Sequence, residues 1–154
     1  MSTSAKHPHI EMATEAQLAD LLQAKTADIG QIYLEAHRLL LETLPDVVYA
    51  TDCTDGMTSY GARQYGYDGW GMAALAAHAK WVSLVFMRGT SLKDENHLLE
   101  GTGKNMRHVK LRSLEAFARR RPGLQALIEQ AVGLNRADEQ TNHTPTQDQR
   151  KQND

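Results

Sequence analysis

The chain of 154 residues is long enough for one domain with a buried core and too short for two. Its formal net charge of -2 gives no overall basic field, so we expect no nucleic-acid partner. Cys53 is the only cysteine, which excludes an intrachain disulfide and a cysteine-rich zinc site.

Both ends of the chain are predicted to be disordered. Residues 136–154 contain no large apolar side chain, and residues 1–11 are mostly polar. Neither stretch can bury enough surface to offset the entropy of ordering. The expectation is therefore a single α+β domain over residues 12–135.

The cellular location follows from what the sequence lacks. The N-terminal region shows no charged segment followed by an apolar core, so no secretory signal is predicted. The longest apolar runs, near residues 72–77 and 81–87, are far shorter than the roughly 20 residues of a membrane-spanning helix. We expect a cytoplasmic protein with no membrane partner.

Two helices are predicted at the start of the domain. The first covers residues 14–25, with Thr14 as its N-cap and Gln17 in position to complete a capping box. The second covers residues 28–44, because apolar side chains recur at three- and four-residue spacing and Pro45 follows. The apolar positions of this second helix are Ile29, Ile32, Tyr33, Ala36, Leu40 and Leu44.

Strand patterns fill the middle of the chain. The clearest is an antiparallel hairpin over residues 70–78 and 81–87, which turns at Ala79 and Lys80. The first arm is rich in alanine, which suits close packing of a helix against it. Three shorter strands are predicted before the hairpin, at residues 47–51, 57–60 and 63–67.

The last part of the domain is predicted to be one strand followed by helix. The strand covers residues 108–111, and Ser113 caps the helical region after it. Pro122 and Gly123 are expected to divide this region into a short helix and a longer one. Strands grouped between helices predict an α+β fold with a small antiparallel β-sheet packed against N- and C-terminal helices.

A glycine-rich stretch at Gly101 to Lys104 is similar to a phosphate-binding loop but lacks two of its elements. Leu98 occupies the position of the first Walker A glycine, and Asn105 replaces the Ser or Thr that would hold magnesium. Nucleotide hydrolysis is therefore not predicted. No nucleophile, base and orienting group can be assembled elsewhere, so no enzyme activity is predicted.

A simpler anion site remains a hypothesis. Two glycines can present successive backbone N–H groups to an anion, and basic side chains near them supply positive charge. The alternative is a glycine-rich turn that leads into a basic edge strand. The residues of the predicted anion or small-ligand site are Lys80, Gly101, Gly103, Lys104 and Arg107.

Three aspartates suggest a metal site. Asp52, Asp55 and Asp68 lie in or beside predicted turns, and carboxylates are ligands for iron and magnesium. The alternative is that they serve the turns, where aspartate is common. The histidines show no ligand spacing of their own, although a convergence of His78, His97 and His108 would favour metal.

Four segments, taken in order, resemble one known family. They are Leu44-Pro45-Asp46, Thr58-Ser59-Tyr60-Gly61, Ala76-Ala77-His78-Ala79-Lys80-Trp81 and the run from Leu98 to Lys104. Together they resemble the YdhG-like family, also catalogued as family 1801 of the domains of unknown function, over about residues 34–132. The resemblance implies a small α+β domain, and some members have been discussed as frataxin-like intracellular iron carriers.

Three functions follow as hypotheses. The first is a binding domain that handles iron through Asp52, Asp55 and Asp68, as the resemblance implies. The second is an anion-binding module that uses the basic residues of the glycine loop. The third is a protein-interaction or homodimerisation domain with no small ligand, for which the exposed hairpin would be the dimer surface.

Overall fold

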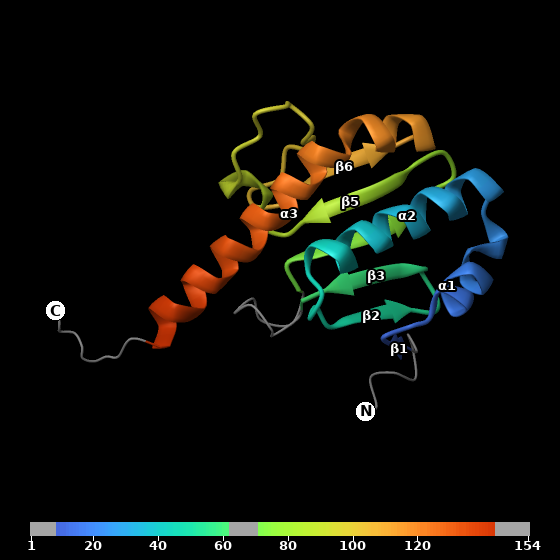
Figure 1. Cartoon of the computed structure of the whole chain (residues 1–154), viewed down its shortest axis with the longest axis horizontal. Coiled ribbons are helices and arrows are strands. Elements are labelled where there is room, and N and C mark those ends of the chain that lie inside the picture. Colours follow the sequence, from blue (N-terminus) through green and yellow to red (C-terminus); the bar gives the residue numbers. More distant parts are fainter. Residues whose placement is uncertain (1–8, 62–70, 144–154) are drawn as a thin grey trace, which may run out of the picture.

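A six-stranded antiparallel sheet forms the centre of the fold (Figure 1). The computed structural model describes residues 9–61 and 71–143, so the predicted strand at residues 63–67 lies outside it. Each strand pairs with the next one along the chain, and the order in the sheet is β1-β2-β3-β4-β5-β6. The strands are β1 His9–Glu11, β2 Tyr49–Asp52, β3 Met57–Tyr60, β4 Ala73–Ala77, β5 Val82–Phe86 and β6 Arg107–Leu111.

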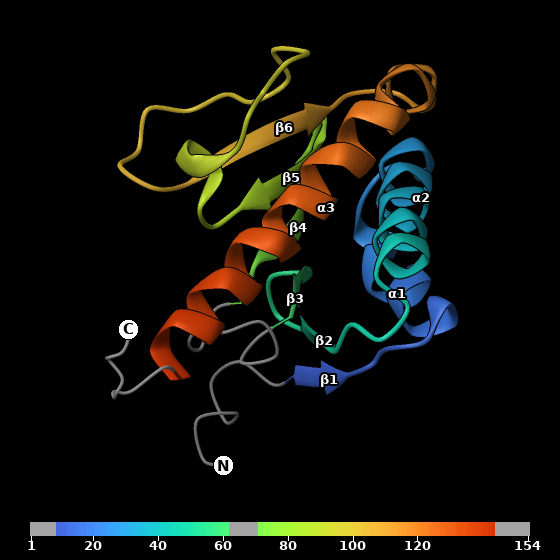
Figure 2. The same ribbon diagram turned by 60° about the vertical axis from the view of Figure 1, so that its left-hand side comes forward.

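The helices cover one face of this sheet, with α2 and α3 side by side (Figures 1 and 2). This arrangement confirms the predicted α+β class. Two single turns of 3-10 helix, η2 Leu22–Ala24 and η3 Gly89–Ser91, complete the described elements. The α-helices are α1 Glu15–Leu21, α2 Ala27–Thr43 and α3 Leu114–His143.

Local sequence signals set most of the helix boundaries as expected. The Thr14 hydroxyl accepts from the backbone N–H of Gln17 at 3.1 Å, and the Gln17 side chain accepts from the Thr14 N–H at 2.9 Å. This is the predicted capping box. Helix α2 begins one residue earlier than predicted, because the Thr26 hydroxyl caps the N–H of Ile29 at 3.2 Å.

Two predictions about the C-terminal region are wrong. Helix α3 runs through Pro122 without a break, although it changes direction along its first half (Figure 2). Phe117 and Leu124, on either side of the proline, are both buried, so packing holds the two parts together. The backbone stays helical to His143, past the predicted start of a disordered tail at residue 136. Residues 144–154 lie outside the description.

The prediction of disorder over residues 1–11 is wrong for its last three residues. His9–Glu11 form β1, in which Ile10 lies opposite Thr51 of β2. Three residues are too few to show a periodic pattern, but Ile10 packs against the core and the exposed edge of β2 supplies backbone partners. Residues 1–8 are not described.

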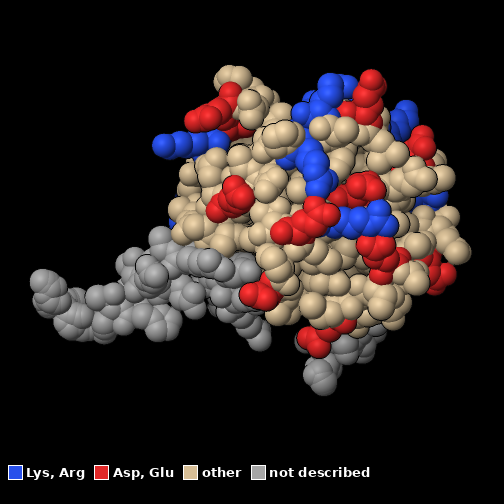
Figure 3. All heavy atoms as spheres, viewed as in Figure 1, with Lys and Arg blue, Asp and Glu red and all other residues tan. Residues whose placement is uncertain are grey.

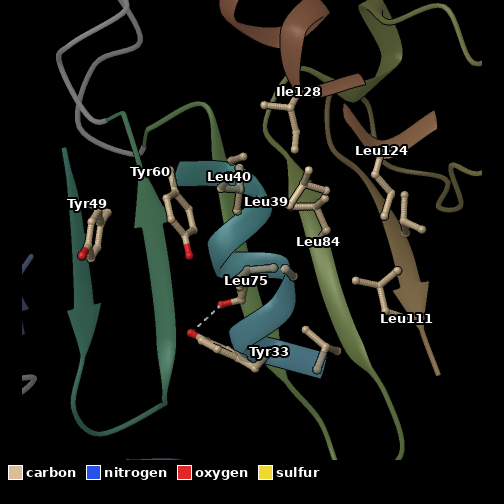
Figure 4. Packing of buried hydrophobic residues seen from close by; sticks show 14 of the residues in the cluster. Tyr33, Leu39, Leu40, Tyr49, Tyr60, Leu75, Leu84, Leu111, Leu124 and Ile128 are labelled. Atoms are coloured by element: carbon tan, nitrogen blue, oxygen red, sulfur yellow. Dashed lines mark hydrogen bonds between the residues drawn. The ribbon is translucent and has the colours of Figure 1, made fainter. Parts of the chain in front are cut away.

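The core lies between the sheet and the two long helices (Figure 4). Leu39 and Leu40 of α2 meet Leu75 of β4 and Leu84 of β5, and all four are at most 1% exposed. Side chains alternate along a strand, so the neighbours of Leu75 in β4 and of Leu84 in β5 point away from the helices. We call this side the second face of the sheet. That second face carries the cluster described below.

Candidate anion-binding site

The predicted anion site is divided between two ends of the sheet. Lys80 lies in the turn between β4 and β5, two residues before β5 begins. Arg107 pairs with Phe86 at the other end of β5. Six residues of extended chain span about 20 Å, so Lys80 and Arg107 do not share one site.

Hydrogen bonds to backbone groups hold the glycine loop in its conformation. The Arg107 guanidinium donates to the carbonyls of Gly103, at 2.6 Å, and Met106, at 2.7 Å. Gly101 has φ 124, a conformation that L side chains rarely adopt. The preceding residue, Glu100, exchanges two backbone hydrogen bonds with His108, at 2.7 and 3.0 Å. These contacts fit the turn interpretation of the loop, in which Lys104 is an exposed loop residue.

Two aspartates of the predicted metal site lie at the connection between β2 and β3: Asp52 is the last residue of β2, and Asp55 is in the turn that follows. The Asp52 carboxylate accepts from the backbone N–H groups of Thr54, at 2.8 Å, and Asp55, at 3.1 Å. Asp55 itself is exposed, and Asp68 lies outside the described residues. Within residues 9–61 and 71–143, no three His, Cys, Asp or Glu side chains gather to hold a metal ion.

The three histidines named above do not meet. His78 directly follows β4 and His108 is in β6, so β5 lies between them. His97 lies in the loop before β6, with φ 55, and its N–H donates to the carbonyl of Asp94 at 3.1 Å.

Strand register brings an aromatic ring and two cations together on the second face of the sheet. The N–H of His78 donates to the carbonyl of Trp81 at 2.8 Å, which closes the predicted hairpin turn. On the other side of β5, Val82 pairs with Leu111, so Trp81 lies beside Arg112. We call His78, Trp81, Lys110 and Arg112 the Trp81 cluster.

The Trp81 ring holds the cluster together. The Lys110 Nζ lies 4.8 Å from the ring centroid and the Arg112 guanidinium carbon lies 5.3 Å from it, both within cation–π range. The His78 ring is 5.0 Å away, tilted by 34°. The indole N–H donates to the Ser83 hydroxyl at 3.0 Å, which fixes the ring orientation.

Positive charge dominates the surroundings of His78. Partial burial lowers the pKa of His78, and the nearby charges of Lys25 and Lys110 lower it further. One carboxylate approaches the cluster, since Glu100 Oε1 lies 3.7 Å from Lys110 Nζ. The exposed Arg112 forms no ion pair with the described part of the chain.

The face covered by helices has a different charge pattern. There, basic and acidic side chains are interspersed (Figure 3). Arg38, for example, binds both Glu15 and Glu35, at 2.7 and 2.9 Å. The Trp81 cluster differs because its cations face an aromatic ring and form a single ion pair with the described residues, between Lys110 and Glu100.

Sequence reasoning identified Lys80 and the hairpin but missed Lys110, Arg112 and His78 as partners of Trp81. The available signal was the two-residue spacing of Lys110 and Arg112, which places both on one face of a strand. Their partner could not be identified, because the register between β5 and β6 is not visible in the sequence.

Comparison with family models, with curated proteins and with solved structures finds no match to this chain. The resemblance to the YdhG-like family therefore stays a prediction. Among the described residues, no helix combines the length and the apolar character needed to cross a membrane.

Proposed function

We propose that this domain is a binding module for a small anion that carries phosphate or carboxylate groups, and that the Trp81 cluster is its site. The observation that carries the proposal is the placement of two cations, Lys110 and Arg112, over one half-buried indole ring. An ammonium and a guanidinium together offer several N–H donors to oxygen atoms. Such a pair matches an anion with more than one charged oxygen.

The aromatic ring supports this function by limiting side-chain motion. Long basic side chains lose rotamer freedom when they bind a ligand, and this loss weakens binding. Contacts with Trp81 already restrict Lys110 and Arg112 before a ligand arrives. Lys80, in the adjacent turn, and Lys25 add positive charge at the edge of the cluster.

Calorimetric titration of the purified chain with inorganic pyrophosphate tests this proposal. We expect binding that weakens when sodium chloride is raised from about 0.05 M to about 0.5 M, because salt screens exposed charges. Lys110→Gln and Arg112→Gln should each weaken binding by about tenfold, the equivalent of one charge-assisted hydrogen bond.

Lys93→Gln is the matched control. It removes the same charge from an exposed lysine outside the cluster. The Lys93 backbone N–H donates to the side-chain oxygen of Gln130 at 2.9 Å, and the Lys93 carbonyl accepts from the Gln130 side-chain nitrogen at 3.2 Å. Binding should be unchanged in this variant. If the native chain does not bind pyrophosphate, the cations only cover the Trp81 ring. The same conclusion follows if Lys110→Gln, Arg112→Gln and Lys93→Gln all lose affinity for pyrophosphate equally.

Iron handling, implied by the resemblance, is tested in the same experiment with ferrous iron under anaerobic conditions. A chain with Asp52→Asn, Asp55→Asn and Asp68→Asn should lose any stoichiometric iron binding if these residues are the ligands. No contact among the described residues favours iron over the anion, so the anion is the proposal of choice.

A further inference from the structure

The two edge strands of the sheet, β1 and β6, differ in how their backbone groups are used (Figures 1 and 2). At β6, His108 exchanges two backbone hydrogen bonds with Glu100, at 2.7 and 3.0 Å. The Arg120 guanidinium also donates to the Lys110 carbonyl of β6, at 3.0 Å. Natural proteins often protect an edge strand in this way. A further strand could pair with β6 only by displacing Glu100 and Arg120.

The register of β1 directs part of its backbone away from the sheet. The N–H of Met12 donates to the carbonyl of Tyr49 at 3.0 Å, and in an antiparallel pair the hydrogen-bonded positions recur at every second residue. Ile10 therefore directs its N–H and C=O toward β2, whereas His9 and Glu11 direct theirs to the free side of β1. Among the residues that the structure describes, none makes a hydrogen bond to these outward-facing groups.

The side chains of β1 complement those of a second, antiparallel β1. His9 and Glu11 are exposed on the second face of the sheet, and Ile10, on the other face, packs against the core. An antiparallel copy of β1 centred on Ile10 brings each His9 opposite Glu11 of the second copy. An imidazole N–H can donate to a carboxylate, and such pairs directly opposite one another stabilise a sheet.

Backbone geometry and charge select this register among the symmetric ones. Each pair of His9 with Glu11 of the second copy exchanges two backbone hydrogen bonds, and the two Ile10 residues meet between them as a non-hydrogen-bonded pair. A one-residue shift would set outward-facing groups against groups that already bond to β2. A two-residue shift would place His9 opposite His9, or Glu11 opposite Glu11, and like charges directly opposite are unfavourable.

We propose that β1 is a dimerisation strand and that its partner is a second copy of this chain. The two copies pair through β1 about a twofold axis at Ile10, which joins their sheets into one. The hairpin of β4 and β5, expected from the sequence to be the dimer surface, has β3 and β6 beside it, so its strands offer no free edge. A contact through one short strand is small, and interfaces below about 1,200 Å² are typical of weak, transient association.

Sedimentation equilibrium of the full chain from about 10 μM to about 1 mM tests the dimer, since this range covers weak association. The apparent mass should rise from 17.2 kDa toward twice that value. Glu11→Pro removes an outward-facing N–H and leaves the bonds between β1 and β2 in place, a position that edge strands accept for proline. This variant should remain a monomer over the whole range, with the thermal unfolding of a folded domain.

Charge changes test the register. Glu11 lies opposite Ala50 within its own chain, so its charge has no partner strand residue to lose. Glu11→Lys places a lysine opposite His9 of the second copy and should weaken dimerisation by about tenfold. His9→Lys places a full positive charge opposite Glu11 and should strengthen it by about threefold. The double variant, with lysines opposite one another, should dimerise least.

Glu95→Lys is the matched control for the change of charge. It alters an exposed residue in the loop before β6, at the other edge of the sheet, and should dimerise as the native chain does. A native chain that stays a monomer at every concentration would overturn the proposal. A dimer that Glu11→Pro and Glu11→Lys leave unchanged would overturn it as well, because the interface would then lie elsewhere.

Discussion

The hydroxyl groups of Tyr33 and Thr58 lie 2.6 Å apart and join α2 to β3 inside the core. Thr58 also lies 2.9 Å from the Thr51 hydroxyl, and the Tyr33 hydroxyl donates to the carbonyl of Gly56 at 3.0 Å. Burial raises the pKa of Tyr33, because a phenolate could not be solvated there. A polar chain thus crosses the interface between helix and sheet, and Figure 4 shows Tyr33 directed toward β4 as well.

Tyr33→Phe should therefore destabilise the domain by about 1–2 kcal/mol. The ring still fills its space, but Gly56 loses a donor in a partly buried position. Thr58 keeps Thr51 as a partner, which limits the loss. Urea denaturation of the native and variant chains measures the change. Equal free energies of unfolding would show that the Tyr33 hydroxyl makes no net contribution.

Two glycines should respond to alanine in opposite directions. A methyl group at Gly89 would lie 2.7 Å from the backbone nitrogen of Arg107 and closer still to its Cβ, so Gly89→Ala should cost about 1–3 kcal/mol. Gly133 is an exposed helical residue with open space around it, so Gly133→Ala should stabilise α3 by about 0.5–1 kcal/mol. Thermal unfolding of both variants gives the comparison. The same sign of change in both would contradict this packing.

His97 should be replaceable by glycine. Its φ of 55 is unfavourable for a residue with a side chain, and the side chain is exposed. His97→Gly should leave stability unchanged or raise it by up to about 1 kcal/mol, since relief of strain is offset by the freedom of glycine in the unfolded chain. His97→Val should lower it by about 1 kcal/mol, because a β-branched residue fits this conformation poorly. Equal stability of the two variants would show that the loop adjusts its backbone.

Local signals in the sequence were sufficient for much of the fold. The periodicity of α2, the Thr14 capping box and the turn at Ala79 and Lys80 each depend on residues close together in the chain. The elements that sequence reasoning missed depend on distant partners. Strand β1 exists because β2 offers an edge, and α3 continues past Pro122 because residues on both sides of the proline are buried.

The candidate site was less predictable than the fold for the same reason. Lys110 and Arg112 reach Trp81 only through the pairing of Val82 with Leu111. About twenty residues separate β5 from β6, so neither composition nor spacing fixes this register. The sequence did draw attention to the glycine loop, whose motif is local, and the contacts of Arg107 give that loop a structural explanation.

The most direct test of the proposed function is a two-dimensional nitrogen–proton spectrum of the labelled chain during titration with pyrophosphate. Trp70→Phe assigns the two indole signals, because it removes one of them. We predict that the Trp81 indole signal and the backbone signals of Lys110 and Arg112 shift together with a single dissociation constant. An unmoved Trp81 signal, with shifts confined to residues 101–104, would contradict the account and place the anion in the glycine loop.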